Sequence, residues 1–298
     1  MIEVLHVWIP TRGRIHQQTS MKRVHLESLY YNRLPNWLQI HFIVPESEKV
    51  AFVATHPWVR PICVVVPDSY RFGSVCQAIA EQSSGYTLLL DDDMWLYKRK
   101  SPLDIHLRTG NKQDAWDFFM QIRHWLRKGY AHGGVSLRQT NRFWPKDIQH
   151  ADPKEAVYHA NTRVCGVTFF DSRVLKTEGI RFDAVQARSD FHVYLSLLEL
   201  GYHNVCEYEF ACGQTSLGSN APGGCSLYRT PEFLIEQALL LRSLHPGLVT
   251  LVYKQRVMKA ARMMVTEQGI PDVRISWAKA LGNRVQDRQG HFEKIMES

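Results

Sequence analysis

Short apolar runs alternate with segments of helical pattern, and this alternation constrains the fold most. The runs cover residues 6–10, 40–45, 62–67 and 86–90, and the helical patterns between them cover residues 18–34, 47–56 and 73–84. Strands that are apolar throughout are buried on both faces, and strands that alternate with helices are typical of a parallel sheet covered on both sides. The sequence therefore predicts an α/β protein whose mostly parallel sheet is flanked by helices.

Three adjacent carboxylates follow the fourth apolar run, at Asp91, Asp92 and Asp93. Adjacent acids repel one another, and a divalent cation that carries a diphosphate is a common solution. In an extended segment Asp91 and Asp93 would point to the same side. Hard oxygen ligands of this kind suit Mg²⁺ or Mn²⁺. We therefore expect Asp91 and Asp93 to hold a metal ion; the alternative is a solvated acidic turn after a strand.

A loop with two arginines, Pro10-Thr11-Arg12-Gly13-Arg14, follows the first apolar run. Arginine side chains suit phosphate groups, and parallel sheets bind their ligands outside the carboxyl ends of the strands. Because this loop and the acidic cluster both follow strands of one sheet, we expect them to meet at the same edge.

A second acidic candidate is Asp190, at the start of a helical pattern that ends before Gly201. Ser189 is expected to be the N-cap residue of this helix. Asp190 would then lie in the first turn, near a cluster of backbone N–H groups. The alternative is a helix-terminal acid that takes part in no chemistry.

The net charge of +7 is concentrated in two segments. Residues 98–150 contain eleven Lys or Arg against four Asp or Glu, and residues 251–298 contain nine against five. Two basic segments on a mildly acidic body favour a polyanionic partner, with nucleic acid as the first candidate. The alternative is a solvated basic face. The residues expected to contact a DNA acceptor are Arg138, Arg142, Trp144 and Lys146.

The six cysteines form no CxxC pair, and several lie in apolar runs. This usage indicates reduced core residues, as in cytosolic proteins. A zinc site at Cys206, Cys212, Cys225 and His203 is disfavoured by their irregular spacing. No apolar run reaches the length of a membrane span, and the N-terminus has no leader pattern. We therefore expect a cytoplasmic protein with no membrane partner.

Two groups of residues resemble the nucleotide-sugar glycosyltransferases of the GT-A fold. The first contains Gly73, Gln77, Ala78, Gly85, Tyr86, Leu90 and the three aspartates, and the second contains Gly166, Phe170, Gly179, Ile180, Arg181, Phe182, Asp183, Ser189, Asp190, Leu198, Gly201 and Tyr202. The resemblance covers roughly residues 4–210, and the order and spacing of the two acidic motifs carry it. Ser189 stands where glutamate is usual, and Gln77 where asparagine is usual; Asp190 itself is intact.

Within that fold, the Pro10–Arg14 loop, the triple aspartate and the basic middle are similar to the TET-associated glycosyltransferases of bacteriophages. Those enzymes modify hydroxymethylated pyrimidines in DNA. The resemblance implies a metal-dependent hexosyl- or pentosyltransferase in the cytoplasm of an infected bacterial host. It would use a nucleotide sugar, with a UDP-sugar favoured, and double- or single-stranded DNA that carries 5-hydroxymethylcytosine.

The resemblance also implies roles for single residues. Asp91 and Asp93 would hold Mn²⁺ or Mg²⁺ and, with Asp92, contact the donor. Asp190 would be the general base for the acceptor hydroxyl in an inverting reaction. The other residues expected at the donor are Pro10, Thr11, Arg12, Arg14, Arg71 and Gly73.

We expect a glycosyltransferase core at residues 1–210, with a donor half at 1–97 and an acceptor half at 98–210. Residues 211–298 would form a lid loop and a basic helical extension that clamps DNA or makes oligomer contacts. Two other functions stay open. One is a glycosyltransferase for a cell-surface glycan, and the other is a non-catalytic nucleic-acid-binding protein on a transferase scaffold.

Overall fold

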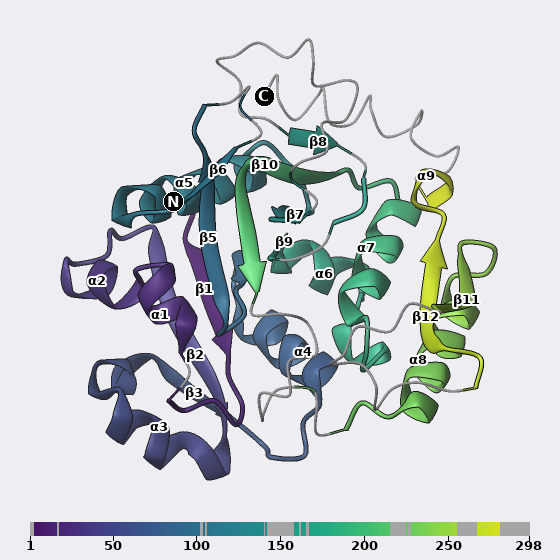
Figure 1. The fold of residues 1–298 in the computed structure, drawn as a ribbon, viewed down its shortest axis with the longest axis horizontal. Helices are drawn as coiled ribbons and strands as arrows, with labels where there is room; N and C mark the ends of the chain where they lie inside the picture. Colours follow the sequence, from purple (N-terminus) through teal and green to yellow (C-terminus); the bar gives the residue numbers. More distant parts are fainter. Residues whose placement is uncertain are drawn as a thin grey trace.

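One large sheet organises the chain (Figure 1). The computed structural model describes residues 3–16, 18–101, 104, 106–139, 141, 158–160, 162–164, 167–214, 225, 228–254 and 267–280. The strands of the sheet are β1 (Leu5–Pro10), β2 (Leu38–Pro45), β3 (Cys63–Val66), β4 (Tyr86–Leu89), β5 (Met94–Arg99), β6 (Leu107–Thr109), β7 (His132–Leu137), β8 (Tyr158–Ala160), β9 (Thr168–Asp171) and β10 (Asn204–Gln214). Their order is β3-β2-β1-β4-β9-β7-β10-β5-β6, and β8 pairs with β10.

The pairs β3–β2, β2–β1, β1–β4 and β7–β10 are parallel. Strands β9, β5, β6 and β8 join the sheet through antiparallel pairs. The predicted α/β class is confirmed, and the arrangement is consistent with a Rossmann-like GT-A fold.

Helices cover both faces of the sheet, because strands such as β1 have apolar side chains on both faces. Alternate residues of β1 point to opposite faces: Leu5, Val7 and Ile9 are buried in one apolar cluster, and Trp8 is buried in another. The helices on the first face are α1 (Thr19–Arg23), α2 (Leu26–Tyr31), α3 (Lys49–Thr55) and α5 (Lys112–Arg127). Those on the second face are α4 (Phe72–Gln82), α6 (Ser172–Glu178) and α7 (Ser189–Glu199).

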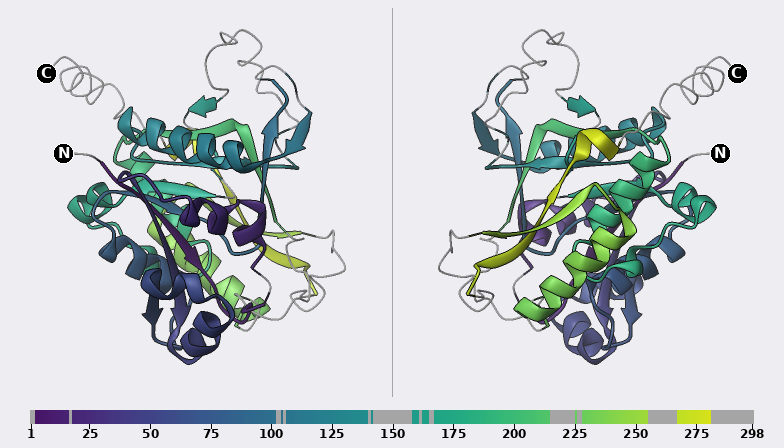
Figure 2. Two further views of the ribbon diagram at one scale, coloured as in Figure 1. Left: turned by 90° about the vertical axis from the view of Figure 1, so that its left-hand side faces the viewer. Right: turned by 90° about the vertical axis from the view of Figure 1, so that its right-hand side faces the viewer.

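The C-terminal elements form a further layer on the outer side of α7 (Figures 1 and 2). They are α8 (Pro231–Leu244), β11 (Val249–Lys254), β12 (Ile270–Ile275) and α9 (Trp277–Ala280). The basic extension was predicted to be helical, and this is wrong for residues 249–254, which pair as β11 with β12 in a separate two-stranded sheet. The boundary predicted at residue 210 falls inside β10. The predicted lid, residues 216–224, lies outside the described residues.

Two helix boundaries differ from the sequence predictions. The helix predicted over residues 18–34 is two short helices, because His25 adopts a left-handed conformation with φ of 57°. The N-cap of α7 is Arg188, with φ of 63°, and Ser189 is the first helical residue. Asp190 still lies in the first turn of α7, as predicted. No helix in the described ranges has the length and apolar character needed to cross a bilayer.

Gly133 and Gly134 of β7 allow close contact with the neighbouring strands of the same sheet. A Cβ atom at Gly133 would lie 2.4 Å from Cζ of Phe169 and 2.5 Å from the carbonyl oxygen of Val205. A Cβ atom at Gly134 would lie 2.6 Å from the carbonyl oxygen of Val167. The two glycines therefore pack against the neighbouring strands β9 and β10 and against the residue before β9.

We expect Gly133→Ala to lower the free energy of unfolding by about 2 kcal/mol or more, the usual cost of overpacking. A matched control is Gly85→Ala, because a Cβ atom at Gly85 has no neighbour within 4 Å. The control should change stability by less than about 0.5 kcal/mol. Urea denaturation followed by circular dichroism measures both, and equal stability of the two variants would contradict the packing argument.

Candidate active site

The predicted meeting of the arginine loop and the acidic cluster occurs at the carboxyl ends of β1 and β4. These strands are parallel neighbours, with Trp8 opposite Leu89. The N–H of Leu90 donates to the carbonyl oxygen of Trp8 at 2.9 Å. The two strands therefore deliver Thr11 to Arg14 and Asp91 to Asp93 to the same edge of the sheet.

Asp92 is the buried centre of this edge. It accepts a hydrogen bond from the Thr11 hydroxyl at 2.6 Å and one from the Arg14 guanidinium at 2.8 Å. The same Arg14 nitrogen lies 3.0 Å from a carboxylate oxygen of Asp93. Arg14 therefore balances Asp92 and Asp93 together and fixes their side chains.

Ser20 of α1 holds the backbone of the acidic turn. Its N–H donates to the carbonyl oxygen of Asp92 at 3.0 Å, and its hydroxyl donates to the carbonyl oxygen of Asp91. The hydroxyl also accepts from the N–H of Met94 at 2.9 Å. Sequence analysis did not identify Ser20, because its partners lie more than seventy residues away and no local motif marks them.

Gln18 supports the arginine loop in a similar way. Its amide nitrogen donates to the Thr11 hydroxyl oxygen at 2.6 Å and to the carbonyl oxygen of Arg14 at 2.9 Å. Gln18 is buried. The Thr11 hydroxyl is therefore oriented toward Asp92, because it accepts from Gln18 and has its own proton left to donate.

Asp91 lies beside the carboxylates of Asp93 and Asp92. Burial and the neighbouring charges of Asp93 and Asp92 raise the pKa of Asp91 to about 7, against the opposing effect of Arg14. The acidic residues form a turn and not the extended segment that was predicted. Within this turn Asp93 shares Arg14 with Asp92.

Asp190 lies near this cluster. Its charge is one of those that raise the pKa of Asp91. Cys76 on α4 is buried near both, and after burial the charges of Asp190 and Asp91 are the largest effects that raise the pKa of its thiol. Burial also raises the pKa of Asp190, while Arg229 and Arg188 counteract it. The two predicted acidic motifs thus face one region between β4, α4 and α7.

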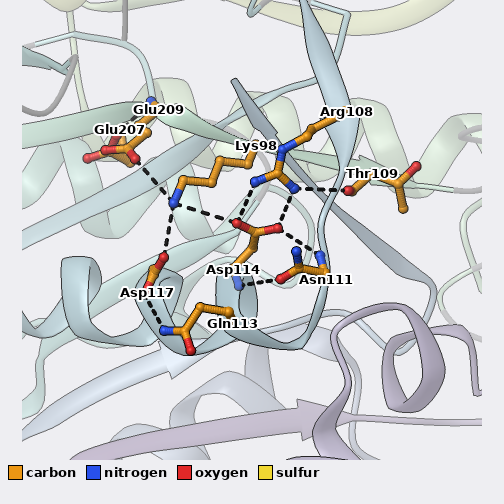
Figure 3. A network of polar contacts seen from close by, with 9 residues as sticks. All are labelled: Lys98, Arg108, Thr109, Asn111, Gln113, Asp114, Asp117, Glu207 and Glu209. Carbon is orange, nitrogen blue, oxygen red and sulfur yellow. Dashed lines mark hydrogen bonds and ion pairs between the residues drawn. The ribbon is translucent and has the colours of Figure 1, made fainter. Parts of the chain in front are cut away.

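A second cluster of carboxylates surrounds Lys98, away from the Asp91–Asp93 turn (Figure 3). Lys98 lies 3.0 Å from Asp117 and 3.6 Å from both Asp114 and Glu209. Burial would raise the pKa of Asp114, but its hydrogen bonds with Arg108 and the N–H of Asn111 outweigh burial and lower it. Asp114 thus has a lowered pKa, whereas burial and neighbouring carboxylates raise the pKa of Asp91. The Asp91–Asp93 turn also lies at the carboxyl ends of parallel strands, where sheets of this kind bind their ligands.

Two residues expected at the donor have partners within the protein. Arg12 donates to the carbonyl oxygens of Tyr70 and Asp68, both at 2.8 Å, and so braces the loop before α4. Arg71 is exposed and lies over the rings of Tyr228 and Phe233, 5.7 Å and 4.8 Å from their centroids. Pro10 is the last residue of β1, opposite Ile43.

The N-terminus of α4, expected to receive a diphosphate at Gly73, is occupied by side chains. The N–H of Phe72 donates to the Tyr228 hydroxyl at 3.0 Å, and the N–H of Ser74 donates to Gln186 at 3.2 Å. A Cβ atom at Gly73 would lie 2.6 Å from the carbonyl oxygen of Val185. Packing against the loop before α7 therefore accounts for the glycine.

Among the residues expected at the acceptor, the structure describes Arg138. It is exposed, lies over the Tyr97 ring at 4.6 Å and donates to the Tyr97 hydroxyl at 3.2 Å. Arg142, Trp144 and Lys146 lie outside the described residues. Cys63, Cys76, Cys206, Cys212 and Cys225 are free thiols, as predicted.

A hard divalent cation fits the acidic cluster. The side chains offer carboxylate oxygen, and the charges of Asp93, Asp92 and Asp190 all act on Asp91. Within the described ranges, no group of three or more His, Cys, Asp or Glu side chains is arranged to hold a metal ion. A cation bound here would therefore take further ligands from a diphosphate or from water, which is the usual habit of Mg²⁺.

The chain is similar in sequence to a phage glucosyltransferase. The chain is 21% identical over 203 residues to the Beta-glucosyl-HMC-alpha-glucosyl-transferase of Enterobacteria phage T2, covering 66% of this chain and 69% of the relative. The resemblance to phage glycosyltransferases is confirmed. No family model matches the sequence. Among solved structures, a 4-diphosphocytidyl-2C-methyl-D-erythritolsynthase from Anaerococcus prevotii covers 59% of this chain and 73% of its own, with 10% identity and a TM-score of 0.35.

The fit of a cation to Asp91 can be tested without activity. Protons and metal ions compete for a carboxylate, so Mn²⁺ should raise the melting temperature more at about pH 8 than at about pH 6, on either side of the raised pKa of Asp91. Asp91→Asn should remove this shift. Asp117→Asn is the control, since Asp117 belongs to the Lys98 network, and it should keep the shift. An equal shift in both variants would place the cation elsewhere.

Proposed function

We propose that this protein is a metal-dependent glycosyltransferase that moves a sugar from a nucleotide-sugar donor to a hydroxyl carried by a modified base in DNA. The observation that carries the proposal is the approach of two acidic motifs, Asp91–Asp93 and Asp190, at the edge where β1 and β4 end. The match to the phage T2 glucosyltransferase supports the same reaction class. The name of that relative contains both a glucosyl transfer and HMC, the abbreviation of hydroxymethylcytosine.

On the donor side, Asp91 and Asp93 would hold Mn²⁺ or Mg²⁺. Asp92 would support them through its hydrogen bonds with Thr11 and Arg14. When bound, the cation would neutralise charge that develops on the leaving diphosphate. Arg14 fixes the side chains of Asp92 and Asp93, because it forms ion pairs with both. The donor favoured is a UDP-sugar, and the relative's name makes glucose the first sugar to test.

On the acceptor side, Asp190 would take the proton of the attacking hydroxyl. A sugar or hydroxymethyl oxygen is a poor nucleophile, and a carboxylate within hydrogen-bond reach activates it. The raised pKa of Asp190 suits a base, because it moves the group toward the pH at which the reaction runs. Arg138, with the basic stretch around it, would bind the acceptor's phosphates, which is expected to make affinity fall with salt.

The hydroxymethyl group of 5-hydroxymethylcytosine is the acceptor we favour. The T2 relative suggests a second candidate on the same base, because its name describes addition of an α-glucosyl group to β-glucosyl-HMC. A cell-surface glycan is the alternative substrate class, and basic charge alone would suit an anionic glycan. The phage relative favours DNA over this alternative.

Mass spectrometry of digested DNA tests the function directly. Three duplexes should be incubated with UDP-glucose and other nucleotide sugars: one with cytosine, one with 5-hydroxymethylcytosine and one with its β-glucosyl derivative. We expect one hexose or pentose to be added to a modified nucleoside and none to cytosine. Transfer to a glycan with no transfer to either modified duplex would overturn the DNA assignment.

Asp190→Asn should lower turnover by roughly two to four orders of magnitude, the usual range for loss of a general base. Donor affinity should change little, because the donor side is built from the β1 and β4 ends. The matched control is Asp183→Asn, since Asp183 is paired with Arg181 in the loop that precedes α7. Nuclear magnetic resonance of the product gives the anomeric configuration. Retained configuration with a normal turnover of Asp190→Asn would contradict the role of a general base.

A further inference from the structure

The loop that leads to Asp190 is held by the C-terminal layer and not only by the sheet. An apolar cluster joins Val185, Leu195 and Leu198 to Leu241 of α8 and to Val249 of β11. Figure 1 shows α8, β11 and β12 along the outer side of α7. Phe191, next to Asp190, packs edge-on against Trp277 of α9 with ring centroids 5.5 Å apart.

Arg188, two residues before Asp190, has a backbone conformation that needs outside support. Its φ of 63° and ψ of 32° lie in the left-handed region, which is uncommon for residues other than glycine. As the N-cap of α7, it sets the direction in which the helix leaves the loop. Such a conformation persists only when surrounding contacts fix it.

The β11–β12 hairpin supplies contacts that fix Arg188. The Nη2 atom of Arg188 donates to a carboxylate oxygen of Asp272 at 3.1 Å and to the carbonyl oxygen of Pro271 at 3.2 Å. Asp272 is itself held by the N–H of Val273 at 2.8 Å and by Lys254 of the partner strand β11. The Nη1 atom of Arg188 is buried without a hydrogen-bond partner among the described residues.

Three more hydrogen bonds join the same loop and helix to the C-terminal layer. The buried Gln237 of α8 accepts from the N–H of Gln186 at 2.6 Å. His245, which follows α8, lies 2.9 Å from the ring nitrogen of His192 and 2.6 Å from Glu199. Positions 186, 188 and 192 are thus each tied to a C-terminal element, and Asp190 lies between them.

We propose that the β11–β12 hairpin positions Asp190 through Arg188, an inference that rests on the function proposed above. Asp272 keeps Arg188 in its left-handed conformation, and this fixes the side from which α7 presents Asp190 to the acceptor hydroxyl. Arg188 and Asp272 are positioning residues, because they act through Asp190. The C-terminal extension therefore serves turnover, and neither a DNA clamp nor an oligomer contact is needed to explain its packing.

The test is steady-state kinetics of the full chain with UDP-glucose and duplex DNA that contains 5-hydroxymethylcytosine or its β-glucosyl derivative. Asp272→Ala should lower kcat by roughly ten- to a hundred-fold, as expected when a reacting group is misplaced by about 1 Å. The KM for UDP-glucose should stay the same, because the β1 and β4 ends are untouched. Asp272→Asn keeps the side-chain volume and should give a similar loss of kcat. It replaces the alanine variant if that variant folds poorly.

Arg274→Gln is the matched control, because Arg274 is an exposed residue of the same strand, β12. Its kcat at saturating DNA should equal that of the parent protein. Asp272→Glu keeps the charge and should recover part of the turnover. Equal losses in Arg274→Gln and Asp272→Ala, or normal turnover in Asp272→Ala with its fold intact by circular dichroism, would overturn the proposal.

Combination with Asp190→Asn separates this inference from the proposed function. If Asp272 acts through Asp190, Asp272→Ala should cause no further loss of kcat in the Asp190→Asn protein. A further ten-fold loss there would overturn the positioning role. Normal turnover of Asp190→Asn would overturn the assignment of the base itself. Impaired Asp190→Asn beside a fully active Asp272→Ala would leave the base in place and reject only the hairpin's role.

Discussion

The contact between Arg14 and the carboxylates of Asp92 and Asp93 is the interaction on which the candidate site depends. Asp92 is buried, and a buried carboxylate without a cation would be strongly destabilising. The guanidinium must therefore stay at the end of β1, and the loop before it must keep its shape. Gln18, Thr11 and Ser20 form the hydrogen bonds that hold that loop and the acidic turn together. Asp91 lies beside the carboxylates of Asp92 and Asp93, and burial and their charges raise its pKa to about 7.

The edge of the sheet could be predicted from sequence because its causes are local. Apolar runs such as residues 86–90 identify buried strands, and parallel neighbours place their carboxyl ends together. Asp190 could be placed in a first helical turn from the same kind of pattern, although its N-cap is Arg188 and not Ser189. Local patterns do not specify a left-handed arginine, because glycine is the usual residue for that conformation.

The contacts that sequence analysis did not identify join residues far apart in the sequence. Arg12, expected at the donor, donates to two carbonyl oxygens of the loop before α4. At the N-terminus of α4, Tyr228, 156 residues away, accepts the first N–H. Residues 249–254 were predicted to belong to a helical extension, and only their pairing with β12 makes them a strand. Helical and extended patterns are hard to separate in short segments, so tertiary pairing decides.

The two sides of the candidate site differ in how they are held, and this has a consequence for the reaction. The proposed donor side is fixed by Thr11, Gln18 and Ser20, which hold the arginine loop and the acidic turn around Arg14. Asp190 is instead supported by groups that come late in the chain, at Gln237, His245 and Asp272. In the proposed reaction, a change in the C-terminal layer would therefore shift Asp190 without disturbing the donor side. Separate supports would allow the acceptor side to be altered for a different acceptor while the donor side stays the same.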